Sequence, residues 1–97
     1  MFKIDNTIYK QLAEELAQQI QYNRLFAGSI SIDTDDADVK FTATLIPHFK
    51  TIEFVDDSAD VLDDITPVWW EVDTTTLDGK VLNDFDFQTF KEYICQW

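Results

Sequence analysis

Residues 25–46, LFAGSISIDTDDADVKFTATLI, contain two alternating stretches that flank an acidic run. In the first stretch, residues 25–33, every second residue lies on the same face: Phe26, Gly28, Ile30 and Ile32. This alternation is typical of a half-buried β-strand. Residues 39–46 repeat the pattern, and Pro47 is expected to end that strand because proline cannot donate to a ladder. Asp is depleted in strands and favoured in turns, so residues 33–38 predict the turn of a hairpin.

An amphipathic helix is expected on each side of this strand region. Residues 7–23 carry an apolar stripe at helical spacing, formed by Ile8, Leu12, Leu16 and Ile20. Residues 87–96 form the second expected helix, whose apolar face comprises Phe87, Phe90, Ile94 and Trp97. Asp5 and Asp86 are the expected N-caps, because their carboxylates can accept from free amides of the first turn.

Two further strands are expected between the hairpin and the second helix. They cover residues 51–55 and 68–75, joined by a loop over residues 56–67. If the region 47–56 is loop instead, three strands remain. The connections are too short for parallel crossovers, so the sequence predicts an antiparallel meander of three to four strands. Both helices need apolar cover, which predicts a single two-layer α+β sandwich over residues 1–97, with both helices on one sheet face.

The charge balance disfavours several classes of partner. Of 97 residues, 19 are acidic and 7 are basic, giving a net charge of −12. Such a surface repels phosphate backbones and anionic membranes, so neither direct nucleic-acid binding nor membrane binding is expected. No apolar run approaches the roughly 18 residues of a membrane-spanning helix. These features predict a soluble cytoplasmic protein.

Catalytic and metal-binding motifs are not expected. A Cys–His pair would require Cys95 and His48, which have no local signature around them. The run that starts at Asp33 superficially suggests a calcium loop. However, Asp38 stands where an EF-hand needs glycine, and Thr44 where it needs a bidentate Glu. We therefore expect no enzyme activity, cofactor or dedicated metal site; a weak divalent-cation binder is the third-ranked hypothesis.

Acidic side chains are concentrated in residues 33–38 and 56–64. In the predicted meander these two runs converge at one end of the sheet and form an acidic pole: Asp33, Asp35, Asp36, Asp38, Asp56, Asp57, Asp60, Asp63 and Asp64. Averaged over the surface, the net charge is about fourfold more dilute than that of duplex DNA. Nine carboxylates within about 1,000 Å² would match DNA locally. The first hypothesis is therefore a protein-binding domain whose acidic pole docks on a basic protein surface, as a nucleic-acid mimic or inhibitor.

A second candidate surface is the sheet face that points away from the helices. Trp69 is expected there among small polar residues, together with Ile46 and Val55. The 56–67 loop could cover Trp69, or the tryptophan could anchor a contact with another chain, since tryptophan is a common hot-spot residue. The alternative hypothesis is thus a homo-oligomeric structural or accessory domain, such as a homodimer. The acidic residues would then serve solubility alone.

Overall fold

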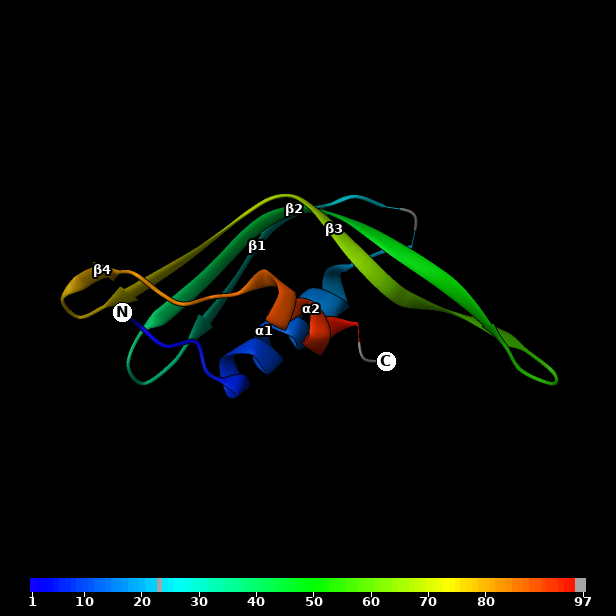
Figure 1. Cartoon of the computed structure of the whole chain (residues 1–97), viewed down its shortest axis with the longest axis horizontal. Coiled ribbons are helices and arrows are strands. Elements are labelled where there is room, and N and C mark those ends of the chain that lie inside the picture. The colour runs from blue at the N-terminus through cyan, green and yellow to red at the C-terminus, as the bar shows by residue number, and fades with distance from the viewer. Residues whose placement is uncertain (23, 96–97) are drawn as a thin grey trace.

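The computed structural model describes residues 1–22 and 24–95, and its strands form one antiparallel sheet in the order β1-β2-β3-β4. The elements are α1 (Asn6–Gln19), β1 (Phe26–Asp33), β2 (Asp38–Glu53), β3 (Ser58–Thr76), β4 (Gly79–Val81) and α2 (Phe87–Ile94) (Figure 1). The predicted α+β class and meander are confirmed. The first helix ends at Gln19, short of the predicted end at residue 23, because Ile20 is already extended; residues 23 and 96 themselves lie outside the described residues.

The sheet curves over the two helices, which both lie on its concave side (Figure 1). The core forms between these layers, and its largest fully buried apolar side chains come from both: Leu12, Leu16, Val39, Phe41, Leu45, Ile65, Phe90 and Ile94. The rings of Phe41 in β2 and Phe90 in α2 lie 5.1 Å apart. Because each such side chain contributes about 1.5–3 kcal/mol on burial, this layer is the main source of stability.

Both predicted helix caps are confirmed. The carboxylate of Asp5 accepts a hydrogen bond from the amide of Ile8 at 2.9 Å, and that of Asp86 accepts from the amide of Thr89 at 3.0 Å. The phenol oxygen of Tyr9 in α1 also accepts from the amide of Asp86 at 2.9 Å. This last bond links the first helix to the start of the second.

The predicted end of a strand at Pro47 is wrong. β2 runs through Pro47 to Glu53, so the expected strand 39–46 and residues 51–53 of the next expected strand belong to one strand of 16 residues, and residues 54–55 lie in the turn. The physical reason lies in the pairing: β1 accompanies β2 only as far as Leu45, and beyond it β3 is the strand paired with β2. Proline is tolerated where one side of a strand has no ladder partner.

The predicted loop over residues 56–67 is also wrong, because β3 begins at Ser58. The turn is shorter: Glu53 pairs with Ser58, and the amide of Phe54 donates to the carbonyl of Asp57 at 2.6 Å. The predicted turn at residues 78–79 is present, with Gly79 at φ 108°, a left-handed conformation that favours glycine. The short strand β4 that follows it was not predicted.

Candidate functional site

The nine carboxylates of the predicted acidic pole lie in two groups at opposite ends of β2. Asp33, Asp35, Asp36 and Asp38 flank or form the β1–β2 turn, whereas Asp56, Asp57, Asp60, Asp63 and Asp64 belong to the β2–β3 hairpin. At about 3.3 Å per residue, roughly 30 Å of strand separates Asp38 from His48, the partner of Asp64, and roughly 50 Å separates the two turns. The predicted convergence was wrong, because it counted the single strand β2 as two strands.

This separation removes the geometric basis for a nucleic-acid mimic built from one acidic pole. A DNA-like charge density required all nine carboxylates within about 1,000 Å², one partner's share of a standard interface. The molecule extends 55 Å along its long axis, and the two groups are at different ends of its longest hairpin. Each group must therefore be considered by itself.

The acidic β1–β2 turn has a local structural explanation. The hydroxyl of Thr34 donates to the carbonyl of Ala37 at 2.8 Å and accepts from the Ala37 amide at 3.0 Å, which closes the turn. Asp33 and Asp38 stand directly opposite each other at its base. A hydrogen bond between the two carboxyls, reinforced by their like charge, raises the pKa of Asp38 above its usual value.

The second group lies on a two-stranded ribbon that we call the arm, residues 46–66. It is the part of the β2–β3 hairpin beyond the end of β1, and it projects away from the helices (Figure 1). Its base is attached to the body: the ring of Phe49 meets that of Tyr22 edge-on at 5.2 Å, and Leu62 is buried. Farther out, residues 51–60 are exposed along both strands. The outer half of the arm therefore adds nothing to the core.

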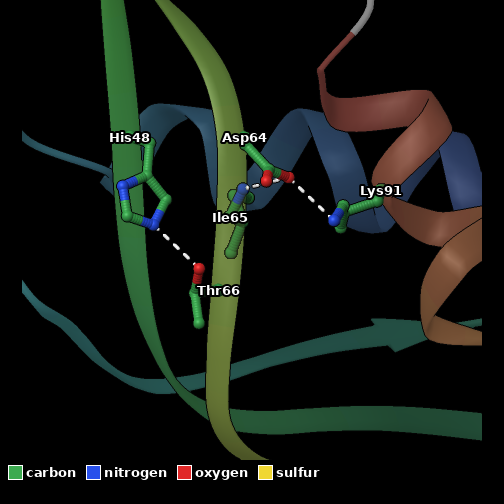
Figure 2. A network of polar contacts seen from close by, with 5 residues as sticks. All are labelled: His48, Asp64, Ile65, Thr66 and Lys91. Carbon is green, nitrogen blue, oxygen red and sulfur yellow. Dashed lines mark hydrogen bonds and ion pairs between the residues drawn. The ribbon is translucent and has the colours of Figure 1, made fainter.

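Side chains at the base of the arm already have partners within the chain. Asp64 accepts from Lys91 of α2 at 2.7 Å and from the amide of Ile65 at 2.8 Å, while His48 contacts the Thr66 hydroxyl at 2.8 Å (Figure 2). The bond from Lys91, followed by that from Ile65, lowers the pKa of Asp64. Asp64 thus ties β3 to α2 and has a structural role.

Two more of the arm's acids have partners close by. Asp63 pairs with Lys50 at 3.4 Å across the ribbon, and Asp60 accepts from the Thr51 hydroxyl at 2.6 Å. Both interactions are exposed, so each contributes little to stability. They hold the side chains of facing strands in register.

The tip of the arm exposes two apolar side chains: Phe54, which the sequence analysis did not select, and Val55, which it placed beside Trp69 on the outer sheet face. Val55 is fully exposed and Phe54 is 60% exposed, directly before the adjacent acids Asp56 and Asp57. The sequence analysis expected residues 51–55 to be a strand of the packed sheet, whereas Phe54 and Val55 lie in the turn beyond the end of β2. The available signal was the position of two apolar residues next to Asp-Asp-Ser, a turn-forming sequence.

Trp69 lies on the outer sheet face, opposite Thr44, and is 49% exposed. The 56–67 segment is not a loop and does not fold over it. The neighbouring Trp70 points to the other face, where its ring stacks on Phe87 of α2 at 5.8 Å and packs on Phe85 at 5.3 Å. The Trp-Trp pair therefore divides between the two faces of the sheet.

The two residues considered for nucleophilic catalysis have other surroundings. His48 hydrogen-bonds Thr66 on the arm, and Cys95 follows the end of α2. Partial burial, followed by the nearby charge of Asp64, raises the pKa of the Cys95 thiol, which disfavours a reactive thiolate. Among residues 1–22 and 24–95, no three His, Cys, Asp or Glu side chains gather in an arrangement that could hold a metal ion.

The chain matches no protein-family model, no curated protein sequence and no solved structure. Within the described residues, neither helix has the length and apolar character needed to cross a membrane.

Proposed function

We propose that this chain is a non-enzymatic protein-binding domain, and that its arm docks on a basic protein surface. The observation that carries the proposal is the exposed apolar tip of an acidic ribbon whose outer half, residues 51–60, lies outside the core. A ribbon of two strands gains little stability from itself. Apolar side chains placed there gain burial only when another molecule covers them.

The charge of the arm supports a basic partner. Residues 46–66 contain six carboxylates and one lysine, a net charge of −5 with His48 neutral. Asp64 is neutralised by Lys91 from outside the arm, but Glu53, Asp56 and Asp57 have no ion pair with any described residue. These three surround the apolar tip. Charge would then guide the approach, while Phe54 and Val55 would supply the buried contact.

Capture of partners from host lysate by matched variants tests this proposal. The arm variant carries Asp56→Asn and Asp57→Asn, and a second carries Phe54→Ser and Val55→Ser. The control carries Asp35→Asn and Asp36→Asn, which removes the same charge from the turn at the other end of β2. We expect the wild type and the control to retain a basic partner that both arm variants lose.

Salt provides the second measurement. The captured partner should be released as ionic strength rises, because the screening length falls from about 8 Å at physiological salt to about 3 Å at 1 M. Thermal unfolding of each variant checks that the fold is intact. Equal capture by the wild type and both arm variants would place binding elsewhere and contradict the proposal.

A further inference from the structure

The outer edge of β1 has no paired strand among the described residues. β1 pairs with β2 in a regular register over all eight of its residues, without a bulge. Between Phe26 and Ile32 it carries no charged residue and no proline, and Ala27, Ser29 and Ser31 are exposed. Such a bulge-free, uncharged edge presents backbone groups that can pair with another strand.

The open side of β3 differs in each of these respects. Its register is interrupted twice, opposite Thr44/Leu45 and His48/Phe49, and Pro67 lies at the first interruption. Acidic residues recur along it, and farther along the side chain of Asn83 donates to the carbonyl of Val72 at 2.9 Å. Bulges, proline and charge are the usual protection against edge pairing. The open side of β3 is thus protected against pairing with another strand, whereas the edge of β1 carries no such protection.

Opposite charges lie at the two ends of β1. Arg24 precedes the strand, is exposed and has no ion pair with another described residue. Asp33 ends the strand and faces Asp38, a contact between like charges. An antiparallel second copy of β1 would place the end of each strand that carries Arg24 beside the end of the other copy's strand that carries Asp33. A parallel copy would instead place like charges together.

We propose that the edge of β1 is a self-association site, at which a second copy of this chain pairs antiparallel about a twofold axis near Ser29. The two sheets would then join into one, with main-chain hydrogen bonds supplying the contact. The small outer side chains at the centre of β1 leave room for the partner strand. This inference is independent of the proposed docking by the arm.

Sedimentation analysis over a range of protein concentrations tests the inference, at about 0.15 M salt so that the long-range repulsion between acidic chains is screened. The wild type should be a dimer. Ser29→Lys places two lysines together near the axis and should weaken the dimer by more than about tenfold. Thr42→Lys, on the same face but one strand inward, is the matched control and should leave the dimer intact. Ser29→Thr guards against a folding artefact and should also dimerise.

Charge reversal tests the orientation of the strands. Arg24→Asp and Asp33→Arg should each weaken the dimer, and the double variant should restore it because the pair is re-formed with its signs exchanged. A monomeric wild type would overturn the proposal. So would a dimer that survives Ser29→Lys, that fails to recover in the double variant, or that is lost in Trp69→Ser, which would place the interface on the outer sheet face.

Discussion

The carboxyls of Asp33 and Asp38 meet at the base of the β1–β2 turn, where pairing places them opposite each other. The hydrogen bond between them and their like charge raise the pKa of Asp38 in the folded protein. A raised pKa stabilises the fold below the pKa of the unfolded chain, and this stabilisation is lost as the pH rises through the folded value. At neutral pH the ionised pair therefore opposes folding.

Asp38→Asn is expected to raise the melting temperature at neutral pH, because the variant has no second charge to repel Asp33. The gain should disappear in acid below the usual aspartate pKa, where Asp38 of the wild type is protonated. Thermal unfolding as a function of pH measures the difference. Asp36→Asn removes the same charge from the same turn without affecting the pair, so an equal gain in that control would assign the effect to net charge.

Between elements, Asp64 and Lys91 form an ion pair at 2.7 Å that joins β3 to α2. The pKa of Asp64 is lowered by Lys91 and by the Ile65 amide. This carboxylate therefore stabilises the fold above the pKa of the unfolded chain, and the stabilisation is lost as the pH falls through the lower folded value. Its side chain is 49% exposed, so solvent screening limits the contribution to about 0.5–1 kcal/mol.

Asp64→Asn is expected to lower the free energy of unfolding by about that amount at neutral pH. The deficit should close in strong acid, where the wild-type carboxylate is protonated as well. Denaturant unfolding at several pH values measures it. Asp63→Asn is the matched control, since its 3.4 Å contact with Lys50 is more than half exposed on both sides. If the free energy of unfolding falls equally in both variants, the loss in Asp64→Asn does not come from the link between β3 and α2.

The helices and the first hairpin could be predicted from the sequence because their signals are local. Caps at Asp5 and Asp86 and the alternation from Phe26 onward need no knowledge of neighbouring strands. The meaning of Pro47, by contrast, depends on where β1 stops. The acids at residues 60–64 indicate a loop only if the segment belongs to a packed sheet; on an exposed ribbon they are compatible with a strand. The position of the candidate site depended on these two points, so it could not be predicted.

On the scale of the whole molecule, β2 has two different environments along one continuous strand. Its first half lies between β1 and β3 above the helices, and its second half forms the arm with β3 alone. Alternate side chains of the first half are buried in the core, whereas residues 51–60 are exposed on both strands. The arm can therefore adapt its outer end to a partner without any change in the core.

Hydrogen exchange should divide β2 at the base of the arm. Amides of residues 39–45 should exchange only on global unfolding, and those of residues 51–53 by local opening of the ribbon. Leu16→Ala, which empties a fully buried position, should cost about 2–5 kcal/mol and accelerate exchange in residues 39–45 alone. If amide exchange accelerates in both halves of β2, the arm unfolds with the body and is not an independent binding element.

If β1 pairs with a second copy, the protection of its amides should also rise with protein concentration, whereas the protection of amides in the arm should not.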